Sequence, residues 1–478
     1  MAEILTPDLC VIGAGSGGLA VAAAARAHGA SVILVERGRL GGAALNTGCV
    51  PSKALVAAGH HAHAIRSGAP FGIAADEPRI NSRKLHDHIQ QVIAGIAPED
   101  SAPRLKALGV EIVQAEGRFV DPRTLSAGET QIRARRFVIA TGARPLVPSI
   151  PGLESVPYFT TETIFDNTRK LTHLVIIGAG PVGLELAQAY NRLGTQVSVV
   201  EPAAPLPQSD PELAEIALRR MREEGVDIRA NTLVSQIQAR SQGIGVIIKS
   251  TSREEMLDAS HILVAFDRVP NLDSLDLDKA HIRRSTADPR RLDVSPGLKT
   301  SNRRVYAIGD AAGGPQSAQL AEYQAGIVVR NALFTLPLRS RPELIPSVTY
   351  TDPEIAEVGL TEAGARQQRK DDFVVTRWSF AQNERALAMR QGFGVAKLIT
   401  DKGGRILGAG IAGAAAGELI ALFSFAIANR LSTRHLAAFV APFPTLSDAA
   451  RRLGLEARRQ RVPNPLLARL VALNRLLP

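Results

Sequence analysis

Cysteine is scarce in this sequence, which has two cysteines among 478 residues. Two cysteines cannot form the disulfide framework of a small secreted fold, so we expect a reducing, cytoplasmic environment. Aromatic residues make up only 4 % of the chain, and no basic stretch alternates with aromatic side chains that would stack on bases. Nucleic-acid binding is therefore not expected.

Long apolar runs are also missing. No run reaches the ~18 apolar residues that suggest a membrane-spanning helix, and the acidic Glu3 and Asp8 are unlike the start of a secretory signal peptide. The composition is otherwise globular, with 45 % apolar and 21 % charged residues. The length suggests about three domains. The net charge of +10 suits anionic substrates or an anionic membrane face, although a general preference for arginine gives the same excess.

A strand–glycine turn–helix–strand pattern occurs twice, at residues 8–35 and 173–200. In both copies an acid closes the second strand, at the same distance from the first glycine (positions 13 to 36 and 178 to 201). The first copy has Gly13, Gly15, Gly18 and Glu36, and the second has Gly178, Gly180, Gly183 and Glu201.

Each copy has the context that supports a dinucleotide-binding fingerprint, because the glycines follow a strand and open a helix. The glycines allow a tight turn, close approach of a pyrophosphate and close helix–strand packing, and the helix N-terminus offers free N–H groups to phosphate. The acids are expected to bind ribose hydroxyls. The sequence therefore predicts two bound dinucleotides.

Residues 41–55, between the two fingerprints, read Gly-Gly-Ala-Ala-Leu-Asn-Thr-Gly-Cys-Val-Pro-Ser-Lys-Ala-Leu. This segment resembles the flavin-dependent pyridine nucleotide–disulfide oxidoreductases, such as dihydrolipoamide dehydrogenase, glutathione reductase and mercuric reductase. Residues 140–142, 305–310 and 347–362 also match motifs of that family. The resemblance covers residues 8–453 in the family's order.

The resemblance implies an α/β fold with two doubly wound Rossmann-type domains, the NAD domain inserted in the FAD domain, and a C-terminal α+β dimerisation domain. A homodimer is implied because the family's active site uses residues of both subunits. The expected segments are 1–150 (FAD, first part), 151–270 (NAD(H)), 271–338 (FAD, second part, and central region), 346–455 (dimerisation) and 456–478 (basic amphipathic tail).

The resemblance also assigns roles to individual residues. Lys53 would lie by the flavin N5 and pair with Glu185, where a cation stabilises the charge that hydride delivery creates. FAD would be held by Gly13, Gly15, Gly18, Glu36, Thr141, Gly142, Gly309 and Asp310. The nicotinamide nucleotide would be held by Gly178, Gly180, Gly183 and Glu201. Because residues 202–207 contain no arginine to hold a 2′-phosphate, NADH is favoured over NADPH.

Two departures from the family pattern concern the disulfide chemistry. Ala44 stands where the family has the first cysteine of its Cys-x4-Cys pair, so only Cys49 remains. Phe443 stands where the family has the histidine that serves as base, which leaves Asp448 without an imidazole to orient. A single thiol cannot close the disulfide that carries electrons to lipoamide or glutathione.

The sequence therefore predicts an enzyme that passes hydride from NADH to FAD and then reduces a non-disulfide acceptor such as a quinone. Two other functions stay open: a single-thiol reductase in which Cys49 handles a small thiol, disulfide or peroxide, and a flavin- and NADH-binding sensor without turnover. A true dihydrolipoamide dehydrogenase is disfavoured.

Two further segments carry residue types that occur in binding sites. His60, His61 and His63 lack nearby Cys, Asp or Glu ligands, so no metal site is predicted. In the tail, Leu466, Leu470, Leu473 and Leu477 fall on one helical face beside arginines. This pattern fits docking on the inner face of a membrane, and it equally fits a helix packed on its own dimer or a frayed end.

Overall fold

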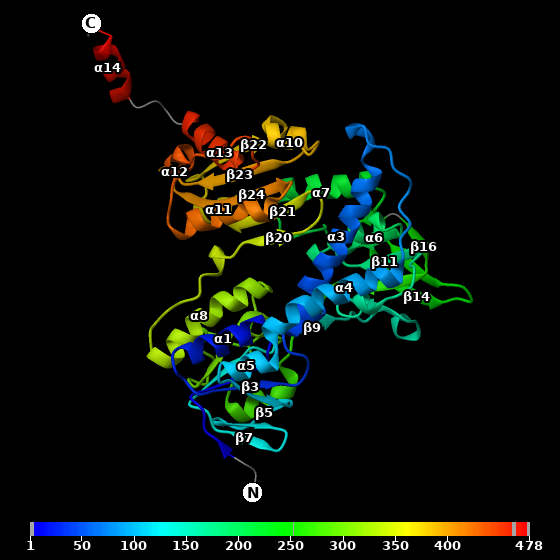
Figure 1. Ribbon diagram of the computed structural model, residues 1–478, viewed down its shortest axis with the longest axis vertical. Coiled ribbons are helices and arrows are strands. Elements are labelled where there is room, and N and C mark those ends of the chain that lie inside the picture. Colours follow the sequence, from blue (N-terminus) through cyan, green and yellow to red (C-terminus); the bar gives the residue numbers. More distant parts are fainter. Residues whose placement is uncertain (1–3, 252, 461–464, 476–478) are drawn as a thin grey trace. The chain divides into compact units, whose positions relative to one another are not determined.

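A computed structural model describes residues 4–251, 253–460 and 465–475 (Figure 1). The chain divides into two compact units. The first comprises Met1–Pro205 and Glu224–Pro342, and the second comprises Leu206–Glu223 and Glu343–Pro478. Within them, the predicted α/β class with two Rossmann-type sheets is confirmed.

The first sheet of the first unit is parallel, with the strand order β19-β8-β2-β3-β4. Its strands are β2 (Leu9–Ile12), β3 (Val32–Glu36), β4 (Glu111–Gln114), β8 (Arg136–Ile139) and β19 (Val305–Ala307). The apolar run of β2 is fully buried, as a central parallel strand requires. On one face α1 (Ser16–Ala27) packs against α8 (Ala318–Phe334), as Figure 1 shows. The late strand β19 thus completes a sheet begun at residue 9.

The second sheet repeats this plan with the order β10-β17-β11-β12-β13, again parallel. Its strands are β10 (Phe159–Thr160), β11 (His173–Ile177), β12 (Gln196–Val200), β13 (Asp227–Arg229) and β17 (His261–Val264). Helix α6 (Pro181–Arg192) follows β11 directly, with Pro181 at its first position, where no N–H partner is needed.

The chain enters and leaves the second sheet through a pair of antiparallel strands, β9 (Ala143–Leu146) and β18 (Asp267–Pro270). Because β9 and β18 pair, the second sheet can be inserted in the chain between β8 and β19 while these two strands stay adjacent in the first sheet. Helices α3 (Cys49–Arg66) and α4 (Ser82–Ile96) pack on each other, and α3 also packs on α6.

Smaller elements complete the first unit. They include β1 (Ile4–Leu5), α2 (Gly42–Asn46), α5 (Ala102–Ala107), β5 (Gly117–Asp121), β6 (Thr124–Ala127), β7 (Thr130–Ile132), β14 (Leu233–Ala239), β15 (Ile244–Lys249), β16 (Glu254–Ala259) and the short turns η4 (Ile164–Asp166) and η7 (Gly309–Ala312).

The second unit is built on an antiparallel sheet with the order β20-β21-β24-β23-β22. Its strands are β20 (Ser347–Thr349), β21 (Glu354–Gly359), β22 (Val374–Ser379), β23 (Val395–Thr400) and β24 (Ile406–Gly413). Its helices are α7 (Pro211–Glu223), α9 (Glu362–Arg369), α10 (Glu384–Ala388), α11 (Ala416–Ala428), α12 (Thr433–Ala438), α13 (Asp448–Arg459) and α14 (Pro465–Asn474).

Two local predictions in this unit were wrong. The pattern of residues 347–358 predicts a single strand, but the structure has the pair β20 and β21, because Pro353 has no N–H to donate to a ladder and the chain turns there. The pattern of residues 445–453 predicts the last helix of the domain there, but the structure has α13, which begins at Asp448 and ends at Arg459. Ala457 is buried, so apolar packing extends this helix into the segment expected to be a tail.

The tail is described only in part. Helix α14 carries the exposed side chains of Leu470, Val471 and Leu473. Leu477 and residues 461–464 lie outside the described residues, and nothing is described of the Leu466 side chain, so the predicted leucine face is seen only in part. Within the described ranges, no helix combines the length and apolarity needed to cross a membrane.

Candidate nucleotide and redox site

The two glycine-rich turns have nearly the same backbone geometry. Gly13 and Gly178 have φ values of +103° and +112°, in the region that favours glycine. A Cβ at Gly13 would lie 2.4 Å from the carbonyl oxygen of Ala140, and a Cβ at Gly178 would lie 2.4 Å from that of Ala265. Only glycine therefore lets these turns close against the next strand of the sheet.

The middle glycines leave room for a ligand. A Cβ at Gly180 would meet nothing within 4 Å, and one at Gly15 would meet only the Cα of Gly42, at 3.9 Å. Both glycines are the N-caps of their helices, and neither supplies a side-chain cap. The first N–H groups of α1 and α6 thus border open space, as a pyrophosphate site needs. The residues present fit FAD at the first turn and a nicotinamide nucleotide at the second.

The predicted ribose-binding acids bridge to their turns. Glu36 accepts hydrogen bonds from the backbone N–H of Ala14 at 2.6 Å and of Gly38 at 2.6 Å. Glu201 accepts from the N–H of Ala179 at 2.8 Å and of Ala203 at 3.0 Å. These bonds fix both carboxylates beside the glycine turns, and each oxygen retains a lone pair for a hydroxyl donor.

Lys53 and Glu185 form the ion pair that the resemblance implies. The Lys53 Nζ lies 2.7 Å from the Glu185 Oε2, with the Glu185 side chain 3 % exposed and the Lys53 side chain 35 % exposed. Lys53 lies on the first turns of α3 and Glu185 on α6, and Gly59 lets these helices approach, since its Cβ would lie 3.2 Å from the backbone of Ala189. The pair positions a cation at a half-exposed site, and its role beside the flavin stays a prediction.

The two cysteines lie in different environments. Cys49, the first residue of α3, is exposed, whereas Cys10 is fully buried in β2. Burial raises the pKa of the Cys10 thiol, so it stays protonated and unreactive. The two cysteines form no disulfide, and Ala44 lies in the short helix α2 that precedes Cys49.

The remaining predicted FAD contacts lie where β8 and β19 end. Gly142 has a φ of +65° and open space on its Cβ side. The Thr141 hydroxyl donates to the backbone oxygen of Asn271 at 2.7 Å, so it ties the two connecting strands together. Gly309 donates to the Gln324 side chain at 2.7 Å. Burial raises the pKa of the Asp310 carboxyl, while the positive charge of Arg268 acts in the opposite direction.

Sequence reasoning missed two polar residues of this region. Asn271 returns the bond of Thr141 by donating its side-chain N–H to the Thr141 carbonyl at 3.0 Å. Arg268 pairs with Glu162 at 3.1 Å. Both residues lie in the short segment 266–271, and its polar side chains are the signal that could have found them.

Phe443, in the second unit, is 76 % exposed. The neighbouring Asp448 accepts from the Arg452 Nε at 2.7 Å, an i,i+4 pair within α13. Arginine thus takes the carboxylate that an imidazole would otherwise use. His60, His61 and His63 all lie on α3. Across residues 4–251, 253–460 and 465–475, no group of three or more His, Cys, Asp or Glu side chains is placed to hold a metal ion.

Comparison with known families agrees with this architecture. Residues 7–325 match the pyridine nucleotide-disulphide oxidoreductase family. Residues 345–453 match the dimerisation domain of the same family.

Individual relatives match over most of the chain. The dihydrolipoyl dehydrogenase of Bacillus subtilis is 32 % identical, over 96 % of this chain and 97 % of its own. A mercuric reductase of Streptomyces lividans is 33 % identical, over 93 % of this chain and 94 % of its own. Among solved structures, the HOCl-induced flavoprotein disulfide reductase RclA from Escherichia coli, in its Cu(II) complex, has a TM-score of 0.81 and 25 % identity, over 93 % of this chain and 98 % of its own.

Proposed function

The chain belongs to the pyridine nucleotide–disulphide oxidoreductase family, whose members are flavin-dependent NAD(P)H oxidoreductases, and from this premise we propose that it reduces a non-disulfide acceptor, such as a quinone, directly from its flavin. Bound FAD supplies the chemistry of accepting hydride from a nicotinamide and passing electrons on. The residues of this chain bind the two dinucleotides at the glycine turns and hold the Lys53 cation on the Glu185 carboxylate.

The observation that carries this proposal is the loss of both halves of the sulfur relay. Ala44 has no thiol, and Cys10, the cysteine other than Cys49, is buried in a strand. Phe443 has no group that takes a proton, and Asp448 is engaged by Arg452. By contrast, both glycine turns, both ribose-binding acids and the Lys53–Glu185 pair are retained. A quinone accepts electrons without a thiol exchange step, so it needs none of the lost groups.

We also propose NADH as the electron donor. Glu201 accepts hydrogen bonds from hydroxyls but repels a 2′-phosphate, and no arginine occurs in residues 202–207 that could offset this repulsion.

An acceptor screen on the FAD-loaded protein tests the proposal. We expect NADH oxidation to be fast with soluble quinones and negligible with oxidised lipoamide or glutathione disulfide. Cys49→Ser separates the candidate functions, because quinone reduction should persist within about twofold while any thiol-linked turnover should disappear. Appreciable lipoamide turnover by the unaltered protein would overturn the proposal.

A single-thiol reductase is the second candidate, and the exposure of Cys49 is the observation that favours it. An exposed thiol can pass through a sulfenic acid or a mixed disulfide. Turnover of a peroxide or a small disulfide that is lost in Cys49→Ser would identify this function. A sensor without turnover is distinguished by stopped-flow mixing with NADH, since its flavin would be reduced slowly and no added acceptor would reoxidise it.

We further propose that the tail brings the enzyme to the inner, anionic face of a membrane, where lipid-soluble quinones reside. Leu470 and Leu473 of α14 are exposed, and Arg469 and Arg475 lie beside them in sequence. Apolar side chains inserted at the interface, with arginines at the headgroups, stabilise such docking.

A further inference from the structure

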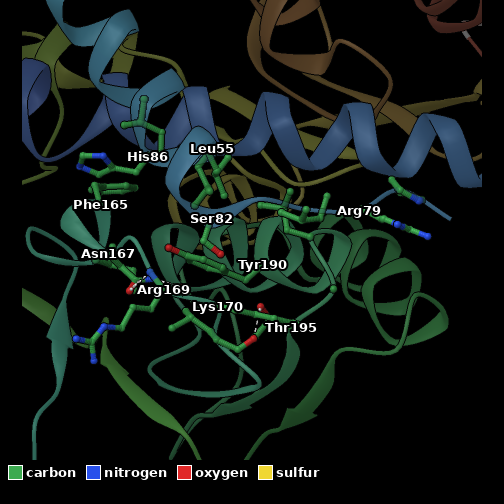
Figure 2. Close-up of a pocket in the computed structure, with 18 of the residues that line it drawn as sticks. Leu55, Arg79, Ser82, His86, Phe165, Asn167, Arg169, Lys170, Tyr190 and Thr195 are labelled. Atoms are coloured by element: carbon green, nitrogen blue, oxygen red, sulfur yellow. Dashed lines mark hydrogen bonds between the residues drawn. The ribbon is translucent and has the colours of Figure 1, made fainter.

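A pocket of about 420 Å³ lies in the first unit, between helices α3 and α4, the turn η4 and the end of α6 (Figure 2). Its volume is in the range of small-molecule sites, which is about 300–1,000 Å³. None of the glycines of the two nucleotide turns, nor Cys49, Lys53 or Glu185, lines it. It is therefore separate from the residues that the proposed function uses.

The inner wall of the pocket is apolar. Leu55 of α3, Ile89 of α4 and Phe165 of η4 are buried and line it together with Tyr190 and Leu193 at the end of α6. Figure 2 shows the Tyr190 ring lying across the middle of the pocket, below Leu55 and Ser82. Such a wall stabilises a bound apolar body by removing its surface from water.

The rim of the pocket is positively charged. Arg66, Arg79, Arg169 and Lys170 line it, and Glu77 is the one carboxylate among its described lining residues. Glu77 is already engaged, since its Oε1 accepts from the Arg66 Nε at 2.7 Å. Arg79, Arg169 and Lys170 form no ion pair with any described residue. In the view of Figure 2, Arg79 and Arg169 lie at opposite ends of the pocket, with Tyr190 between them.

We propose that this pocket binds an amphiphilic anion, namely a short aliphatic or aromatic body that carries one carboxylate. The apolar wall takes the body, and Arg169 and Lys170, neighbours at one end of the pocket, take the carboxylate through charge-assisted hydrogen bonds. An uncharged ligand of the same body would use only the wall. A cationic ligand would be repelled by the positive charges of the rim.

The position of the pocket makes its occupant a neighbour of the redox machinery. Leu55 follows Lys53 by two positions on α3, and Tyr190 follows Glu185 by five positions on α6. A ligand in the pocket thus contacts both helices that carry the Lys53–Glu185 pair. The inference does not rest on the identity of the electron acceptor, because no residue of the lost sulfur relay takes part.

Titration calorimetry of the FAD-loaded protein with octanoate, compared with 1-octanol, tests the proposal. We expect one saturable octanoate site that persists at saturating NAD⁺. Arg169→Gln/Lys170→Gln should weaken octanoate binding by about tenfold or more and change 1-octanol binding by less than about twofold. The control Arg123→Gln/Lys249→Gln removes the same charges from exposed side chains outside the pocket and should leave octanoate binding unchanged.

A second variant tests the volume of the pocket rather than its charge. Ser82 lines the pocket on α4 and is not the N-cap, which is Asn81, so Ser82→Trp fills the space without removing a helix cap. We expect this variant to retain FAD and to lose octanoate binding. The absence of a saturable octanoate site in the unaltered protein, equal affinity in Arg169→Gln/Lys170→Gln, or displacement of octanoate by NAD⁺ would each overturn the proposal.

Discussion

Lys53 is a charged residue that pairs with a buried carboxylate where two helices pack together. Its ammonium group holds a Glu185 carboxylate that is almost completely buried. The sequence indicated this pair only through its family resemblance, because the two residues are far apart in the chain. The close crossing of α3 and α6 at Gly59 brings them to 2.7 Å.

Replacing this lysine should affect flavin reduction and stability together. For Lys53→Met, we expect the rate of flavin reduction by NADH to fall by about 10²-fold or more, because a preorganised cation is lost where negative charge develops. The buried Glu185 carboxylate also loses its partner, which lowers the free energy of unfolding. Stopped-flow absorbance and denaturant titration measure the two effects. Lys84→Met, on the exposed side of α4, is the control, and equal reduction rates in both variants would contradict the role of Lys53.

At the scale of elements, the two glycine turns form a matched pair. A Cβ at Gly18 would lie 1.9 Å from the oxygen of Gly13, and one at Gly183 would lie 2.2 Å from the oxygen of Gly178. Because these contacts are with backbone atoms, a side chain at either glycine would force the helix to move away from its turn.

Alanine at Gly18 should therefore weaken FAD binding, and alanine at Gly183 should weaken binding of the nicotinamide nucleotide. We expect Gly18→Ala to lose most of its FAD on purification. We expect Gly183→Ala to keep FAD and to raise the KM for NADH by about tenfold or more, since overpacking costs about 1–3 kcal/mol. Flavin absorbance and steady-state kinetics provide the measurements. The assignment of the turns would be wrong if Gly183→Ala were the variant that lost FAD.

In the second unit, Lys397 of β23 joins three carboxylates. Its Nζ lies 2.7 Å from Asp210, 2.9 Å from Glu212 and 3.0 Å from Glu362, and its side chain is 3 % exposed. Burial opposes ionisation of Glu212 and Glu362, but hydrogen bonds from Lys397 and Arg377 outweigh it and lower the pKa of both carboxyls. The cluster fixes the N-terminal ends of α7 and α9 to the sheet.

Lys397→Met should destabilise this unit by about 3–5 kcal/mol at neutral pH, because it leaves the buried Asp210 carboxylate without its cation. Glu212 and Glu362 keep their ion pairs with Arg377. In the unaltered protein, the stability that Glu212 and Glu362 contribute is present above the unfolded pKa of glutamate and is lost as pH falls through their lowered folded pKa values. Acid protonates the one carboxylate that the variant leaves without a cation, so the difference between the two proteins should shrink at low pH. The exposed Lys402→Met control should cost less than about 1 kcal/mol. Thermal unfolding at several pH values measures this stability difference. A difference that grew on acidification would contradict this account.

At the scale of the whole molecule, the dimerisation domain leads to a homodimer. Light scattering of the purified protein should therefore give twice the chain mass of 50.8 kDa.

The tail makes a separate prediction at this scale. Removing residues 461–478 leaves α13 intact, so we expect NADH oxidation with a soluble quinone to be unchanged. Sedimentation with vesicles that contain anionic lipid should be lost in the shortened protein, and high salt should weaken it in the full chain. Equal sedimentation of both proteins would show that the tail does not dock on membranes.

The sequence alone determined the parts of this protein that are local in the chain. A glycine turn between a strand and a helix, with an acid after the next strand, is read from neighbouring residues, and so are the missing thiol at Ala44 and the missing imidazole at Phe443. Tertiary structure alone decided what depends on contact between distant residues. Three examples are the bonds between Thr141 and Asn271, the carboxylate cluster around Lys397 and the charged pocket beside α3. Each joins residues from separate elements. The spacing of these residues in the chain follows no helix or strand period, so their contact could not be predicted from the sequence.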